Sequence, residues 1–286
     1  MRPDPLRNVP ALLRIAPDET PRAAQWPAAL ARLDLALART LKNDGDVRVV
    51  CADMLGRPVV VKLWTLRSLP DRLKAMLGAS RAHRHWRGGA CLLAAGIPTA
   101  RPIALLRDAA PGSPPRMALV MEHLSGPTAL EALADRARGP RARHDAARAV
   151  ARTTAALVHA GLFNRDHKPS NLILTTRAGT LDAAVIDTVA IRRLPRHQVW
   201  RPLRTLASLV IEPTGVGLPP PRTLIVRVVH EYLRVLFARE AGRPVDDAEW
   251  RPHVGPIIDR VSRLVRAHGD PTPRVNPLAP HLPPPR

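Results

Sequence analysis

The stretch GLFNRDHKPSNLIL, residues 161–174, stands out in a chain of 286 residues that is rich in Ala, Arg and Pro. It holds Lys168, one of only four lysines against forty arginines, between Asp166 and Asn171. A basic surface can be built from either residue type, so a lysine kept here indicates a need for a compact ammonium group. A carboxylate, an ammonium and a side-chain amide thus fall within one short loop.

The spacing of these groups fits the transfer of a phosphoryl group. NRDHKPSN has the form H-R-D-x-x-x-x-N of a kinase catalytic loop, with Asn164 in the place of His. We expect Asp166 to accept a hydroxyl proton and Asn171 to hold Mg²⁺, while Lys168 neutralises charge on the transferred phosphate. Asp187 follows the apolar run AAVI and is the expected second metal ligand.

Two upstream segments complete the predicted nucleotide site. VVVKLW, residues 59–64, places Lys62 on a β-branched strand, where its ammonium can pair with the α- and β-phosphates of ATP. LVMEHL, residues 119–124, is a strand that runs into a hinge. We therefore expect ATP to bind beside Lys62, Glu122, His123 and Leu124.

Composition limits the partners and the compartment. The formal net charge of +20 favours an anionic partner, such as an anionic membrane surface. Nucleic acid is disfavoured because aromatic residues, which stack on bases, make up only 3% of the chain. The two cysteines form no disulfide framework, and the first twenty residues lack the apolar core of a signal peptide. We expect a cytoplasmic protein, either soluble or peripheral on the inner face of the membrane.

The order of the predicted elements indicates an α+β fold of two lobes. A helix is expected over 27–40, a hairpin over 46–64 around DMLGRP, a helix over 70–95, and strands after it. Helical patterns dominate from residue 125 onward, apart from two short strands after the loop. The predicted divisions are an N-terminal extension (1–26), a small β-rich N-lobe (27–122), a larger, mostly helical C-lobe (123–268) and a disordered Pro-rich tail (269–286).

With these motifs in view, the chain resembles the protein-kinase-like superfamily, and most closely the lipopolysaccharide core (Kdo and heptose) kinases. The resemblance spans roughly residues 45–210 and rests on GRPVVVKLW, GIPTARPIAL, ALVMEHL, the loop and AAVIDTVAI. It implies ATP- and Mg²⁺-dependent phosphorylation of a sugar hydroxyl on lipid A–core, at the cytoplasmic face of the membrane.

Two positions depart from the family pattern. His85 stands where the first-lobe helix usually carries a Glu that pairs with the strand lysine, and Thr205 stands in place of an Asp. These changes keep a second hypothesis open, that of a pseudokinase acting as a regulatory or scaffold module. A third is an atypical Ser/Thr protein kinase.

Overall fold

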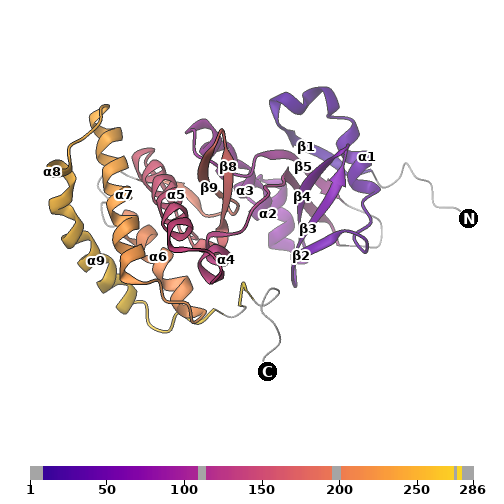
Figure 1. The fold of residues 1–286 in the computed structure, drawn as a ribbon. Helices are drawn as coiled ribbons and strands as arrows, with labels where there is room; N and C mark the ends of the chain where they lie inside the picture. The colour runs from indigo at the N-terminus through magenta and orange to yellow at the C-terminus, as the bar shows by residue number, and fades with distance from the viewer. Residues whose placement is uncertain (1–8, 109–113, 195–200, 274–275, 279–286) are drawn as a thin grey trace, which may run out of the picture. The chain divides into compact units, whose positions relative to one another are not determined.

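The computed structural model describes residues 9–108, 114–194, 201–273 and 276–278, and the chain divides into two compact units (Figure 1). The first unit contains Met1–Leu93 and Ala100–Leu124. The second contains Ala94–Thr99 and Ser125–Arg286.

The first unit is built on an antiparallel sheet, which has six strands within the described residues, in the order β1-β5-β6-β4-β3-β2. In chain order they are β1 (Ala11–Ile15), β2 (Arg39–Asp44), β3 (Val47–Met54), β4 (Arg57–Thr65), β5 (Pro102–Asp108) and β6 (Arg116–Glu122).

The hairpin β3–β4 confirms the prediction made from DMLGRP. Both residues of its tight turn, Leu55 and Gly56, have positive φ angles. This is the backbone that a type I′ turn requires. Gly56 adopts it freely, whereas Leu55 does so at a cost of about 1 kcal/mol. The register, with Met54 opposite Arg57, decides which β4 side chains share a face.

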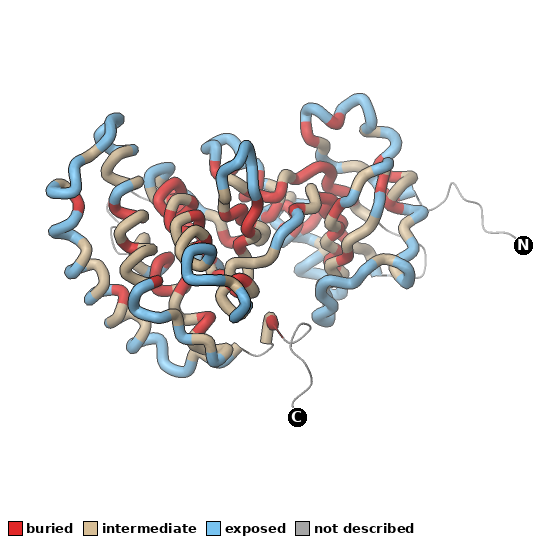
Figure 2. The backbone as a smooth tube through the Cα atoms, viewed as in Figure 1, coloured by how far each residue is buried: buried red, intermediate tan, exposed pale blue. Residues whose placement is uncertain are grey.

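Each face of the sheet is covered by helix. Val59, Val61 and Leu63 of β4 belong to one core cluster, in which Trp26 and Leu30 of α1 (Gln25–Ala31) are buried. Alternation along the strand places Lys62 on the opposite face. There the core contains residues of α2 (Leu69–Met76) and α3 (Arg81–Ala94), and Figure 2 shows burial concentrated along the strands.

Three segments of the first unit differ from the sequence prediction. Residues 27–40 are not one helix: α1 ends at Ala31, and β2 begins at Arg39 because the edge of β3 offers backbone groups that a strand can pair with. The helix over 70–95 is broken at Gly78, whose left-handed backbone ends α2. The described part of the stretch 1–26, which was predicted as an N-terminal extension, contributes β1 and a 3₁₀ turn (Pro17–Arg22).

The second unit is mostly helical, as the sequence predicts. The central helix α5 (Pro140–His159) ends just before Gly161, which has a left-handed backbone. Its inward face is buried along much of its length (Figure 2). The helices are α4 (Ala129–Ala134), α5 (Pro140–His159), α6 (Arg201–Gly215), α7 (Arg222–Ala241), α8 (Asp247–Trp250) and α9 (Val254–Arg266), with 3₁₀ turns at Pro169–Asn171 and Arg251–His253.

Two small antiparallel sheets of two strands each flank the predicted loop. The strands β8 (Leu172–Arg177) and β9 (Thr180–Val185) confirm the two short strands expected after it. In addition, β7 (Leu162–Asn164) pairs with β10 (Ile191–Arg193). The predicted tail lies largely outside the described residues, and Leu278, within its described part, is buried. Over the described ranges, no helix is long and apolar enough to cross a membrane.

Candidate active site

The loop between β7 and β8 is held in shape by its own hydrogen bonds. The Asp166 carbonyl accepts the Lys168 N–H at 3.0 Å and the Asn171 Nδ2–H at 3.0 Å. The Asn171 N–H donates in turn to the Lys168 carbonyl at 2.9 Å. These bonds fix the backbone positions from which the three side chains project, and Asp166 itself is exposed.

Asn164, the residue in the histidine position of the motif, joins the loop to Asp187. Its buried side chain accepts the Asp166 N–H at Oδ1 (3.1 Å) and donates from Nδ2 to the Asp187 carbonyl (3.4 Å). One amide thus spans the segments that carry both predicted acidic residues. The sequence marked this position as a departure, whereas the structure gives it a positioning role.

Asn171 and Asp187 are brought together by the β8–β9 ladder. Leu172 lies opposite Val185, and the Ile186 N–H continues the ladder by donating to the Asn171 carbonyl at 3.0 Å. Asp187 therefore lies one residue beyond a direct backbone partner of Asn171. Its Oδ1 also accepts the Val189 N–H at 3.3 Å.

The donor set of these two side chains fits Mg²⁺. Carboxylate and amide oxygens are the hard ligands that Mg²⁺ prefers, and it usually takes only one or two from the protein, with phosphates and water supplying the rest. Because Nδ2 of Asn171 is engaged with Asp166, the side-chain oxygen is the atom that would face an ion. Among the described residues, no cluster of three or more His, Cys, Asp and Glu forms a separate metal site.

Glu212 of α6 anchors the loop from outside, and sequence analysis missed it. Its buried carboxylate accepts the Ser170 N–H at 2.8 Å and the Ser170 Oγ–H at 2.6 Å, and it pairs with Lys168 Nζ at 3.4 Å. The ion pair restrains the ammonium that the sequence assigned to phosphate. Glu212 lies more than forty residues along the chain from the loop, so no local pattern points to it.

His167 packs the loop against α5. The imidazole is fully buried, and its Nε2 lies 2.9 Å from Thr154 Oγ1. Burial lowers the pKa of His167 to about 4, so the ring is neutral at physiological pH.

Asp166 and Lys168 line a cavity of about 590 Å³ within the second unit. Its walls carry more basic than acidic groups. Three arginines and a histidine line it in addition to Asp166, Lys168 and Glu212, and the last two form an ion pair. The additional basic residues are Arg165, Arg192, Arg204 and His268. A polar molecule with negative charge fits such a lining.

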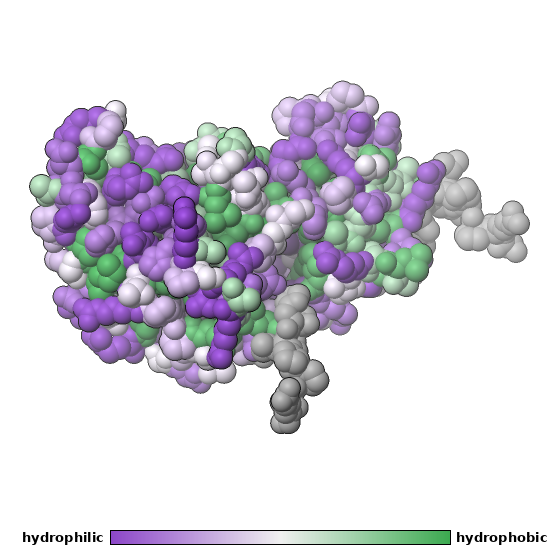
Figure 3. Space-filling model, viewed as in Figure 1, coloured by the Kyte–Doolittle hydropathy of each residue, from purple (hydrophilic) through white to green (hydrophobic). Residues whose placement is uncertain are grey.

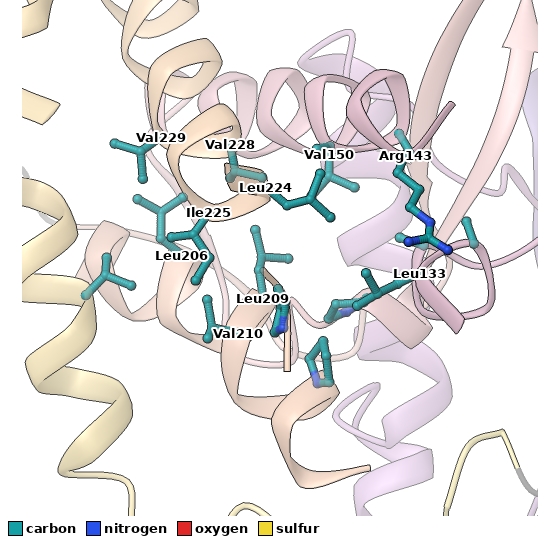
Figure 4. Close-up of a pocket in the computed structure, with 18 residues that line it drawn as sticks. Leu133, Arg143, Val150, Leu206, Leu209, Val210, Leu224, Ile225, Val228 and Val229 are labelled. Atoms are coloured by element: carbon teal, nitrogen blue, oxygen red, sulfur yellow. The ribbon is translucent and has the colours of Figure 1, made fainter. Parts of the chain in front are cut away.

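A second cavity of the same unit, of about 90 Å³, lies between α4, α5, α6 and α7 (Figure 4). Its walls are apolar side chains such as Leu206, Leu209 and Leu224, and Arg143 stands at its edge (Figure 4). Among the described residues that line it there is no carboxylate. It therefore offers neither a general base nor a carboxylate metal ligand.

The predicted nucleotide-binding residues all lie in the first unit. Lys62 pairs on β4 between Val49 and Leu119, and Glu122 ends β6, where its N–H donates to the Arg101 carbonyl at 2.9 Å. His123 is half-buried and Leu124 is buried. The structure thus groups Lys62, Glu122, His123 and Leu124 in one unit, and Asp166, Lys168, Asn171 and Asp187 in the other.

A family model described as the lipopolysaccharide kinase (Kdo/WaaP) family matches residues 50–206. The chain belongs to this family. The matched segment contains every residue predicted for the site, whereas Glu212 lies beyond its end. The resemblance proposed from the motifs is therefore confirmed.

A solved structure supports the fold independently. The chain is similar to the structure of "WaaP in complex with acyl carrier protein", with a TM-score of 0.56 and 18% identity, over 89% of this chain and 99% of that one. At this identity the likeness concerns the fold, which is α+β and kinase-like, with an antiparallel sheet followed by a helical region, as predicted. No curated protein sequence matches the chain.

Proposed function

We propose that the protein transfers the γ-phosphoryl group of ATP to a sugar hydroxyl, on lipopolysaccharide core or a related glycolipid. Membership of the kinase family supports a phosphotransferase. The main support for the proposal is the pair of hydrogen bonds that the Asn164 side chain makes. It accepts the Asp166 N–H at 3.1 Å and donates to the Asp187 carbonyl at 3.4 Å, which holds the two acidic segments together. We infer that this reaction takes place on the cytoplasmic side, where ATP is available.

Asp166 acts as the general base in this mechanism. Its exposed carboxylate takes the proton of the acceptor hydroxyl as that oxygen bonds to the γ-phosphorus, and the bond to the β-phosphate oxygen breaks to release ADP. Lys168 offsets negative charge on the transferred group. The ion pair with Glu212, at 3.4 Å, keeps the Lys168 ammonium at the loop.

The remaining predicted residues hold the donor. ATP supplies the phosphoryl group, and Mg²⁺, when bound, neutralises its phosphates. Asn171 and Asp187 would be the protein ligands of the ion. Lys62 would pair with the α- and β-phosphates, and Glu122, His123 and Leu124 would line the nucleotide.

The basic cavity beside Asp166 is the proposed acceptor site. Its volume of about 590 Å³ falls in the range of small-molecule sites. Its arginines suit an acceptor whose sugar carries a carboxylate or phosphate group. A neutral sugar would make less use of these charged donors.

A transfer assay with labelled ATP tests the function. The purified full chain is offered lipopolysaccharide-derived glycolipids, free sugars and generic protein substrates, and Asp166→Asn serves as the matched control. Label on the glycolipid that disappears in the control supports the proposal. Label on protein substrates alone favours an atypical Ser/Thr protein kinase, and ATP binding without any transfer favours a pseudokinase.

We propose the binding of acyl carrier protein as a second candidate function, because a similar structure contains that partner. The feature of this chain that favours it is the apolar cavity with Arg143 at its edge (Figure 4), which has room for a short apolar segment. Pulldown with acylated and unacylated carrier protein tests the idea. A bulky Leu209→Trp variant should weaken capture of the acylated form only, and equal capture of both forms by both proteins would refute a role for the cavity.

A further inference from the structure

The helix α2 turns its large apolar side chains outward. Leu69, Leu73, Met76 and Leu77, the last at its C-terminal cap, are 77%, 56%, 70% and 73% exposed. Their spacing of i, i+4, i+7 and i+8 places them along one stripe, about 100° wide, of an α-helix. Within α2 the buried residue is Ala75. The apolar face of this helix is therefore the face that points away from the core.

This outward orientation is built into the fold. The Ser68 hydroxyl caps the helix by accepting the Asp71 N–H at 3.2 Å. Ala75 is part of the core cluster against the sheet, and Arg72 Nε donates to the Leu66 carbonyl at 3.2 Å. Because the inner side of α2 is fixed by these contacts, the helix cannot roll its leucines inward without breaking them.

The charges of α2 are arranged around the stripe. At about 100° per residue, Arg72 and Lys74 each lie about 100° from the centre of the stripe, one on either side, and Asp71 lies about 170° away. An apolar strip bordered by cations, with the carboxylate on the far side, is the layout of a helix that lies in a membrane interface. Figure 3 shows that hydrophilic side chains cover much of the surface in view, with hydrophobic side chains in separate patches between them.

We propose that α2 docks onto an anionic lipid surface. The stripe inserts at the boundary of headgroups and acyl chains, and Arg72 and Lys74 lie at the level of the lipid phosphates. The net charge of +20 adds long-range attraction to such a surface. The occupant is lipid and not a second copy of the chain, because a helix of eight residues offers far less area than a stable interface between two proteins needs.

Vesicle co-sedimentation of the full chain, without nucleotide, tests the proposal. The vesicles are phosphatidylcholine with or without phosphatidylglycerol. A Leu73→Ser/Met76→Ser double variant leaves the charge unchanged and removes apolar surface, so it should bind the anionic vesicles roughly tenfold more weakly at physiological salt. The matched control is Leu37→Ser, which changes a side chain that is 85% exposed outside α2 and should bind as the wild type does.

The outcomes separate this proposal from catalysis. Since both substituted residues are exposed, the double variant should keep its thermal unfolding midpoint and its transfer to a water-soluble acceptor. Equal vesicle binding by the double variant and the wild type would overturn the proposal, as would equal weakening by Leu37→Ser. A wild-type dimer that the double variant converts to a monomer would also overturn it, by assigning the stripe to a second copy.

Discussion

The imidazole of His85 on α3 is buried close to the ammonium of Lys62 on β4. Burial, and then the positive charge of Lys62, hold the pKa of His85 well below 6.5. The ring is therefore neutral at physiological pH. The resemblance led us to expect a Glu partner for the strand lysine at this position, and the chain instead places an uncharged ring near it.

The burial of His85 changes what His85→Glu is expected to do. From the sequence, a partly exposed pair with Lys62 would add about 1 kcal/mol to ATP binding. The site is only 1% exposed. A Glu there is stable only if Lys62 neutralises it, because an unpaired buried charge costs about 3–5 kcal/mol. We predict that Lys62→Ala destabilises the His85→Glu protein by about 3 kcal/mol more than it destabilises the wild type.

Denaturant unfolding of the four proteins in this double-mutant cycle gives the difference. ATP affinity, measured alongside, should fall with Lys62→Ala in both backgrounds. Additive effects of the two substitutions on the free energy of unfolding would show that residues 62 and 85 do not interact.

Substitution of the two acidic residues of the site should have different effects on transfer and on ATP binding. Asp166→Asn removes the proposed base and should lower the transfer rate by about 10²–10⁴-fold with ATP affinity unchanged. Asp187→Asn should weaken ATP binding only when Mg²⁺ is present. Calorimetric titration with and without Mg²⁺, together with the transfer rate, separates the two. Equal Mg²⁺-dependent affinity in all three proteins would contradict a ligand role for Asp187.

Glu212 is expected to position the loop without touching the substrates. Glu212→Gln keeps the shape of the side chain and removes the charge that pairs with Lys168 at 3.4 Å, so the transfer rate should fall about tenfold. Ser170→Ala is the matched control, since it removes the 2.6 Å bond to Glu212 and leaves the ion pair in place. A rate loss in Ser170→Ala as large as that in Glu212→Gln would assign the effect to loop packing and not to the lysine.

The stability of the protein should depend on pH through its buried histidines. His167 has a pKa of about 4 when folded and 6.5 ordinarily, so below pH 6.5 the unfolded chain binds a proton that the folded chain does not. The free energy of unfolding should therefore fall as the pH drops from about 6.5 to about 4. The contribution of His167 is on the order of 3 kcal/mol.

His167→Gln isolates this contribution. Gln can keep a hydrogen bond to Thr154 but does not titrate, so the difference in unfolding free energy between variant and wild type should change over this pH range. A difference that stays constant from pH 7 to pH 4 would show that His167 is protonated in the folded state as readily as in the unfolded state.

The sequence by itself determined the local parts of this protein. The loop from Asn164 to Asn171 and the hairpin β3–β4 were predicted because a motif or a turn depends on residues that are close in the chain. The helix-rich second unit followed from periodicity. The kinase-like arrangement of the two lobes was predicted from the resemblance to the family.

Tertiary structure decided which groups that are distant in sequence come into contact. Glu212 reaches the loop only because α6 packs beside it, and residues 39–44 became a strand because the edge of β3 was there to pair with. The amphipathic pattern of α2 did not reveal that its apolar side faces outward, since periodicity is the same for both orientations. Burial of His85 likewise depends on the sheet beneath α3. Such contacts depend on packing between segments distant in sequence, and no local pattern encodes them.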